Sequence, residues 1–127
     1  EELDFRKQAG FSPDGRNLLF YEENAANEYT LRMMPVDSAE SQVYTLLTGV
    51  ASPFPVAWSP DSAELAVGSD GRLQSFSTGT GNVARAWDTG RWRVMPVAWS
   101  PDGRYLTLQG VNLSEQEEAL FVVDTLQ

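Results

Sequence analysis

The residues of this sequence that could do chemistry are mainly carboxylates. The chain has 18 acidic residues against 9 basic ones, and it contains no histidine and no cysteine. Three aspartates, Asp14, Asp61 and Asp102, recur in the same phrase, Ser-Pro-Asp. A recurring carboxylate could bind a cation or move a proton, but aspartate is also common in turns because its side chain bonds to the backbone two residues further on. The recurrence favours turn chemistry, and we expect the three aspartates to be structural.

Catalysis by this chain is not expected. Without histidine, neither a Ser-His-Asp triad nor a histidine-ligated metal site can be built from its residues alone. A pair of carboxylates for glycoside hydrolysis remains formally possible. The candidates are Glu22, Glu23, Glu115, Glu117 and Glu118. Nothing in their spacing sets two of them at the separation that this reaction needs. The sequence therefore predicts a protein that is not an enzyme, with no catalytic residue, no cofactor and no metal site.

One short stretch, Arg91-Trp92-Arg93, indicates binding. It stands before the last Ser-Pro-Asp phrase, where the preceding copy has the small and uncharged residues Val-Ala-Ser-Pro at 50–53. Tryptophan and arginine are the residue types enriched at binding hot spots. We expect a loop from Arg91 to Arg93 to contact a partner, and the alternative is that Trp92 folds onto a neighbouring sheet. Two acidic loops, predicted at residues 22–27 and 110–118, are the other expected contacts, the second of them through Glu115, Glu117 and Glu118.

The recurring phrase also defines the elements that must position these residues. Residues 55–61 recur unchanged as residues 96–102, and a weaker copy stands at 11–15. In Ser-Pro-Asp-Gly, proline at the second position and glycine at the fourth predict a type I β-turn. Apolar residues at every second position on both sides of the turn predict strands. The expected turn and core residues are Ser12, Pro13, Asp14, Gly15, Trp58, Ser59, Pro60, Asp61, Trp99, Ser100, Pro101, Asp102 and Gly103.

The spacing of the copies predicts the architecture. Their serines are 47 and 41 residues apart, and repeats of about 40 to 50 residues are typical of four-stranded propeller blades. We predict an all-β fold of about three blades in a single propeller segment, 1–127. The first blade covers about 3–48, with strands near 3–11, 17–21, 28–36 and 42–47. The second covers about 54–89, with Asp70-Gly71 predicting a hairpin between two of its strands. The third covers about 95–127 and lacks its last strand.

Three blades do not close a propeller, because propellers close with about four to eight. Two solutions stay open. Either the chain is a piece of a longer propeller, which we favour, or two copies complete a six-bladed ring by two-fold symmetry. The expected partners therefore include further blades of the same protein or a second copy of this chain.

The charge argues against two other classes of partner. The net charge is −9, and the basic residues are scattered instead of forming the cluster that nucleic acid requires. No run of about 18 apolar residues is present, so membrane insertion is not expected. The lack of cysteine fits both the cytosol and the periplasm.

The repeated phrase resembles a known blade motif. Trp58-Ser-Pro-Asp-Ser and Trp99-Ser-Pro-Asp-Gly, each preceded by Pro-Val-Ala, look like the blades of TolB-like propellers. Residues 65–71 also resemble a WD-repeat unit, although no Gly-His pair occurs and Phe76-Ser77 stands where Trp-Asp would end the repeat. The resemblance implies a rigid platform whose loops and channel bind proteins or peptides. It also favours a periplasmic or other extracytoplasmic location over the cytoplasm.

The function expected from these features is a non-enzymatic β-propeller scaffold that binds a protein or peptide. Similar blades occur in the prolyl-oligopeptidase group, where a propeller gates access to a separate hydrolase domain. The alternative is therefore an accessory propeller domain of a larger enzyme, with the catalytic groups elsewhere. One fold hosts many functions, so the resemblance bears mainly on architecture.

Overall fold

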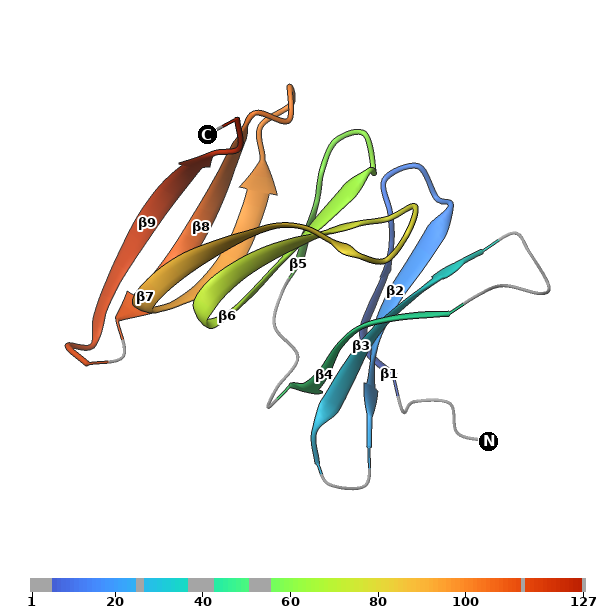
Figure 1. The fold of residues 1–127 in the computed structure, drawn as a ribbon, viewed down its shortest axis with the longest axis horizontal. Coiled ribbons are helices and arrows are strands. Elements are labelled where there is room, and N and C mark those ends of the chain that lie inside the picture. Colours follow the sequence, from blue (N-terminus) through green and yellow to red (C-terminus); the bar gives the residue numbers. More distant parts are fainter. Residues whose placement is uncertain (1–5, 25–26, 37–42, 51–55, 113, 127) are drawn as a thin grey trace. The chain divides into compact units, whose positions relative to one another are not determined.

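The chain folds as β-strands and turns throughout the part that the computed structural model describes, residues 6–24, 27–36, 43–50, 56–112 and 114–126 (Figure 1). It forms two compact units, Glu1–Pro53 and Phe54–Gln127, each built on one antiparallel sheet. Over the same residues, no helix is present that could cross a membrane. The predicted all-β fold is confirmed.

The first unit contains a four-stranded sheet in the order β1-β2-β3-β4. Its strands are β1 (Arg6–Phe11), β2 (Asn17–Glu23), β3 (Tyr29–Pro35) and β4 (Tyr44–Val50). They lie close to the four strands that the sequence predicts for the first blade. Residues 3–5, at the start of the first predicted strand, lie outside the described residues.

Alternation along β2 and β3 builds the interior of this sheet. Leu19 lies opposite Met33, and Tyr21 lies opposite Leu31. All four side chains are at most 2% exposed. Successive residues of a strand point to opposite faces, and Phe20, between Leu19 and Tyr21, is also buried. Strand β2 is therefore covered on both faces, as a strand inside a propeller blade should be.

The second unit contains a five-stranded sheet in the order β5-β6-β7-β8-β9. Its strands are β5 (Val56–Trp58), β6 (Glu64–Ser77), β7 (Val83–Trp99), β8 (Tyr105–Asn112) and β9 (Glu117–Asp124). Figure 1 shows β6 and β7 as long, curved strands. The first half of β6 pairs with β5 and its second half with β7, while the second half of β7 pairs with β8. This change of partner along each strand curls the sheet.

The hairpin predicted at Asp70-Gly71 is wrong. β6 runs through this position, and Asp70 lies opposite Arg93 at a shift of register. Gly71 has a positive φ of 80°, and a Cβ there would lie 3.0 Å from the carbonyl oxygen of Gly90. The glycine thus lets β6 bend at a bulge against β7 instead of reversing the chain. The described residues of the ranges 54–89 and 95–127 share one sheet, and the limits of the second and third blades stay a prediction.

Two segments expected as loops are parts of strands. Residues 91–93 lie inside β7. The long acidic loop expected from 110 to 118 is a tight turn, because β8 and β9 extend into it from both sides. Asn112 accounts for this turn: its side-chain oxygen accepts the backbone N–H groups of Ser114 and Glu115 at 3.0 and 3.3 Å. Asparagine side chains form such bonds to the backbone two residues further on and thereby stabilise a turn.

The interior of the curled sheet is an apolar cluster. Its buried members are Ala57, Ala66, Leu73, Val94, Leu106 and Leu108. Five partly buried side chains pack against them: Trp87, Trp92, Trp99, Phe121 and Val123. The cluster draws on all five strands, so the curl of the sheet and its hydrophobic core depend on each other.

Candidate functional site

Each of the three Ser-Pro-Asp turns has the same pattern of hydrogen bonds. In the first, the Ser12 hydroxyl donates to Asp14 Oδ1 at 2.6 Å, and the same oxygen accepts the N–H of Arg16 at 2.9 Å. The turns at 59–62 and 100–103 repeat both bonds. In each turn the fourth residue also donates its N–H to the carbonyl of the first, at 2.9 Å. This is the hydrogen bond that defines a β-turn.

These bonds set the ionisation of the turn aspartates. Donation by the serine hydroxyl, and then by the backbone N–H two residues on, lowers the pKa of Asp14, Asp61 and Asp102. All three are exposed to solvent. Efficient acid–base catalysis needs a pKa near the working pH, and these shifts go the other way. The aspartates hold the turns and are unsuited to proton transfer.

The fourth residue of each turn has a left-handed backbone. The φ angles are 73° at Gly15, 61° at Ser62 and 77° at Gly103. Glycine adopts this conformation without steric cost, whereas a residue with a Cβ does not. Ser62 is therefore the strained member of the set. It is buried, and its carbonyl oxygen accepts the Thr78 hydroxyl at 2.7 Å.

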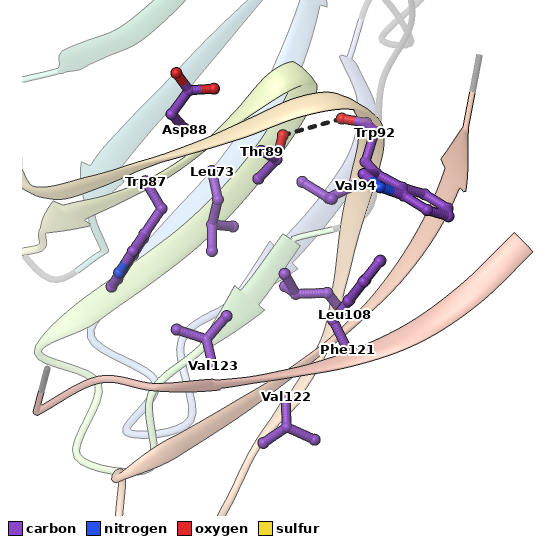
Figure 2. A pocket seen from close by; sticks show the side chains of 10 residues that line it. All are labelled: Leu73, Trp87, Asp88, Thr89, Trp92, Val94, Leu108, Phe121, Val122 and Val123. Atoms are coloured by element: carbon purple, nitrogen blue, oxygen red, sulfur yellow. Dashed lines mark hydrogen bonds between the residues drawn. The ribbon is translucent and has the colours of Figure 1, made fainter. Parts of the chain in front are cut away.

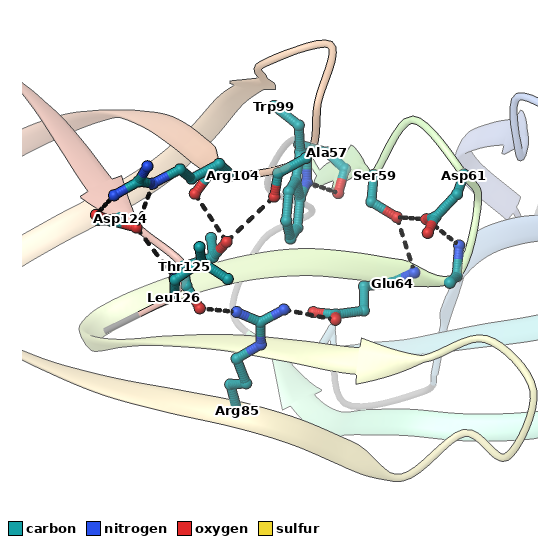
Figure 3. A network of polar contacts seen from close by, with 12 residues as sticks. Ala57, Ser59, Asp61, Glu64, Arg85, Trp99, Arg104, Asp124, Thr125 and Leu126 are labelled. Atoms are coloured by element: carbon teal, nitrogen blue, oxygen red, sulfur yellow. Dashed lines mark hydrogen bonds and ion pairs between the residues drawn. The ribbon is translucent and has the colours of Figure 1, made fainter.

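A polar network connects the second and third of these turns to the strands of the second sheet (Figure 3). Arg85 on β7 forms an ion pair with Glu64, with 2.7 Å between Nη2 and Oε2, and donates its other terminal nitrogen to the carbonyl of Thr125. The indole nitrogen of Trp99 donates to the carbonyl of Ala57 at 3.0 Å. A buried indole N–H usually finds such an acceptor. The network joins β5, β6, β7 and the end of β9, and thereby holds the curl of the sheet.

The hollow of the curled sheet is an apolar cavity of about 270 Å³ (Figure 2). Its lining residues are Leu73, Trp87, Asp88, Thr89, Trp92, Val94, Leu108, Phe121, Val122 and Val123. Eight of these ten are apolar, and Asp88 and Thr89 are the polar exceptions. Sites for small molecules usually begin at about 300 Å³. The cavity is therefore better suited to one large side chain than to a whole ligand.

Trp92 forms one wall of this cavity. Its ring meets Phe121 edge to face with centroids 4.9 Å apart. Its carbonyl oxygen accepts the Thr89 hydroxyl at 3.0 Å, as Figure 2 shows. Gly110 provides the space, because a Cβ there would lie 2.7 Å from Phe121 and 3.2 Å from Trp92. Trp92 thus packs inside the curled sheet, and any part it takes in binding is through the cavity.

The other sequence-predicted contact residues lie outside the cavity. Arg91 is exposed, and its guanidinium donates to the Ser114 hydroxyl at 3.4 Å, beside the acidic turn. The carboxylates of this turn and of the strand after it are exposed as well: Glu115, Glu117 and Glu118. Arg93 follows Trp92 along β7, so its side chain is on the opposite face of the strand. The structure brings Arg91 to the acidic turn and separates Arg93 from the cavity.

The carboxylates considered for glycoside hydrolysis are divided between the two units. Glu22 and Glu23 belong to the first, and Glu115, Glu117 and Glu118 belong to the second. Glu22 is engaged by Arg32, with 3.4 Å between Oε1 and Nε. Over the described parts of the chain, no group of three or more carboxylates could hold a metal ion.

Sequence reasoning missed three important cavity residues, Leu73, Trp87 and Phe121. Their period-two spacing signals strands but does not say which strands face each other. The pairing depends on the bulge between β6 and β7, where Gly71 and Gly90 have positive φ angles. In the sequence, these two glycines are the only sign of the bulge. Glycine alone does not distinguish a bulge from a turn.

Comparison with known proteins bears on the fold. No model of a known protein family matches the sequence, and no curated protein matches it significantly. Among solved structures, the chain is similar to a TolB-like protein of Agrobacterium tumefaciens, with 17% identity and a TM-score of 0.67 over 94% of this chain and 43% of that one. It is similar to hydrazine synthase of Kuenenia stuttgartiensis, with 16% identity and a TM-score of 0.66 over 92% and 38%. It is also similar to the Cps50 (Swd1) β-propeller domain of Myceliophteria thermophila, with 16% identity and a TM-score of 0.58 over 92% and 37%.

The chain spans less than half of each of these structures. At such low identity the likeness shows the fold and not the activity. It agrees with the two antiparallel sheets of the described chain and with the resemblance of the repeated phrase. The chain therefore has the fold of part of a β-propeller, similar to the propellers of these structures.

Proposed function

We propose that this chain is a non-enzymatic β-propeller scaffold that binds a protein or peptide. The observation that carries the proposal is the apolar cavity of about 270 Å³ with Trp87, Trp92 and Phe121 in its walls. Interface hot spots are typically large side chains of one partner that fill such pockets in the other. Aromatic walls add favourable contacts for an aromatic or branched guest.

The negative charge of the chain favours a partner that is basic. The chain carries a net charge of −9, and the exposed Glu115, Glu117 and Glu118 stand at the turn that Arg91 contacts. Opposite charges across an interface speed encounter and exclude wrong partners more than they add affinity. We therefore expect the side chain that enters the cavity to be flanked by lysine or arginine.

The test uses the tripeptide Lys-Trp-Lys, with Glu-Trp-Glu as its control. The chain has four tryptophans, so four indole N–H signals report in a proton–nitrogen NMR spectrum. Lys-Trp-Lys should shift the signals of Trp87 and Trp92 and leave that of Trp99, which is bound to the Ala57 carbonyl, in place. Glu-Trp-Glu should shift them less. Unmoved Trp87 and Trp92 signals at millimolar peptide would contradict the proposal.

A matched pair of variants locates the effect. Val123→Phe places a ring inside the cavity, where Val123 is part of the lining, and should abolish the shifts. Leu120→Phe adds a similar ring at a site 72% exposed and outside the lining, and should leave them. Equal behaviour of the two variants would show that the peptide binds elsewhere.

A second function is supported by one comparison. Hydrazine synthase, an enzyme by its name, contains a region similar to 92% of this chain. An accessory propeller of a larger enzyme, such as a prolyl-oligopeptidase-type hydrolase, would have such a region beside its catalytic part. The sequence of the full-length protein separates the two proposals, because a Gly-x-Ser-x-Gly nucleophile elbow outside residues 1–127 would favour the enzyme.

A further inference from the structure

Two indole N–H groups in the walls of the apolar cavity have no acceptor. Trp87 and Trp92 are both half-buried, and neither ring nitrogen donates a hydrogen bond to a residue that the structure describes. The indole of Trp99, by contrast, donates to the carbonyl of Ala57 at 3.0 Å. Tryptophan N–H groups that leave water usually find an acceptor. A guest that fills the cavity displaces water from both groups, so it must bring acceptors for them.

The polar residues of the lining offer a guest few acceptors in return. Figure 2 shows the Asp88 side chain pointing away from the hollow. The Thr89 hydroxyl is held by the carbonyl of Trp92 at 3.0 Å. An N–H group that a guest buried here without an acceptor would weaken binding by about fivefold or more. The cavity therefore favours a guest that is rich in carbonyl groups and poor in N–H groups.

Proline is the residue that meets this requirement. It has no backbone N–H, and its carbonyl oxygen remains able to accept a hydrogen bond. Its apolar ring also suits aromatic walls. Trp92 and Phe121 stand at 79° to each other with centroids 4.9 Å apart, and Figure 2 shows Trp87 on the opposite side of the hollow. Aromatic grooves of this kind bind proline-rich segments in several unrelated domains.

We propose that the cavity binds a proline-rich segment of a partner protein. The inference rests on the proposed function and names the class of segment that enters the cavity. A proline ring lies between the aromatic walls, and carbonyl groups of the segment accept the N–H groups of Trp87 and Trp92. A proline-rich segment is already extended before it binds and makes no internal hydrogen bonds, so its carbonyl groups are free and little conformational entropy is lost.

The register of the strands adds a carboxylate at one end of the cavity. Trp92 lies opposite Asn112, and Asn112 lies opposite Glu117 on its other side. Residues that face each other across antiparallel strands project to the same side of the sheet, so Glu117 shares the cavity face with Trp92. Glu117 is exposed and forms no ion pair with a described residue. Glu118, the next residue of β9, projects to the opposite face.

This carboxylate gives the segment its charge. At the other end of the cavity, the guanidinium carbon of Arg85 lies 6.0 Å from the centre of the Trp87 ring, so a second cation is unfavourable there. Charges across an interface are arranged to be complementary, which fixes the register of a bound segment. The expected segment therefore has a lysine or arginine beside its prolines, and this basic residue lies at the Trp92 end, next to Glu117.

The first experiment compares three peptides of the form acetyl-X-X-X-X-Arg-amide, in which X is proline, N-methylalanine or alanine. The first two lack backbone N–H groups, and proline adds the ring. We expect affinity to fall in that order. The proline peptide should bind at least about tenfold more tightly than the alanine peptide, because each buried N–H without an acceptor costs about fivefold. In proton–nitrogen NMR, the indole protons of Trp87 and Trp92 should move downfield as they bond to carbonyl groups, while that of Trp99 stays in place.

Variants test the same contacts from the protein. Glu117→Gln should weaken the proline peptide by about threefold, the size expected of an exposed ion pair. Glu118→Gln is the matched control on the opposite face and should leave affinity unchanged. Trp92→Phe keeps an aromatic wall without the N–H and should weaken binding by about fivefold. A thermal melt checks that each variant folds, and the downfield shift in the unaltered chain gives an independent answer should Trp92→Phe not fold.

The outcomes separate this inference from the proposed function. Indole shifts with Lys-Trp-Lys, together with equal affinities of the proline and alanine peptides, would overturn the inference and leave the proposed function standing. The absence of indole shifts with any of these peptides would overturn both. Binding of the proline peptide that neither Trp92→Phe nor Glu117→Gln weakens would place the segment outside the cavity, and the inference would be wrong.

Discussion

Replacing Gly110 by alanine tests how the cavity wall is built. Gly110 lies on β8 beneath the Trp92–Phe121 pair, and a Cβ there would be 2.7 Å from Phe121 Cε2 and 3.2 Å from Trp92 Cε3. Real Cβ atoms do not approach so closely, so one or both rings must move. The substitution therefore forces apart two rings that now meet edge to face at 4.9 Å.

The size of the effect follows from two contributions. Forcing an extra methyl group into a packed interior costs about 1–3 kcal/mol. Losing an edge-to-face aromatic contact costs about 0.5–1.5 kcal/mol more. We expect Gly110→Ala to lower the free energy of unfolding by about 1.5–4.5 kcal/mol. At about 4–8 °C per kcal/mol for a unit of this size, the Tm should fall by at least about 6 °C.

The assay is thermal and urea unfolding, followed by near-ultraviolet circular dichroism, which reports the tryptophan environment. Gly79→Ala is the matched control, because the nearest atom to a Cβ at Gly79 is Ser77 Oγ at 3.9 Å and the φ of Gly79 is not positive. The control should change stability by less than about 0.5 kcal/mol. If Gly110→Ala melts at the same temperature as Gly79→Ala, the close packing of Trp92 on Phe121 is refuted.

Three further predictions concern the turns and the network. Trp99→Phe removes the N–H donated to the Ala57 carbonyl and should cost about 1 kcal/mol in urea unfolding, and an unchanged midpoint would contradict the bond. Ser62→Gly removes the Cβ from a residue with a left-handed backbone and should raise Tm by a few degrees. A lower Tm would contradict the proposed strain at Ser62. The pKa of each turn aspartate is lower in the folded chain than in the unfolded chain. Their stabilisation is therefore complete above about pH 5 and is lost as the pH falls through the unfolded value and then the lowered folded value. Asp102→Asn should flatten the decline of the urea midpoint between about pH 5 and pH 2, and an unaltered decline would contradict a lowered pKa.

Local sequence signals predicted the elements well and their long-range pairing poorly. The turn at Ser100-Pro-Asp-Gly103 is encoded by neighbouring residues, and its bonds span at most five positions. By contrast, the bend at Gly71 depends on β7, whose Arg93 lies opposite Asp70. The glycine is visible in the sequence, but no local signal shows which strand will pair with the residues around it.

The placement of Trp92 shows the same limit for the candidate site. Its residue type and neighbours predicted a contact residue on a loop, whereas Trp92 lies within β7. Nothing local indicates that Phe121 would lie 4.9 Å away. The glycine that makes room for the pair, Gly110, was expected only as the start of a loop. The apolar cavity that Trp92 and Phe121 line was not predicted either.

The shared strand β7 changes what counts as the repeating unit. It pairs with β6 over its first half and with β8 over its second, so neighbouring repeats, which are 41 residues apart, share one strand. New chain ends introduced at the exposed turn of residues 79–80 would leave every ladder of this sheet intact. Ends introduced near residue 90 would divide β7 and uncouple the two copies. Duplication or deletion of blades should therefore succeed at the first kind of junction and fail at the second.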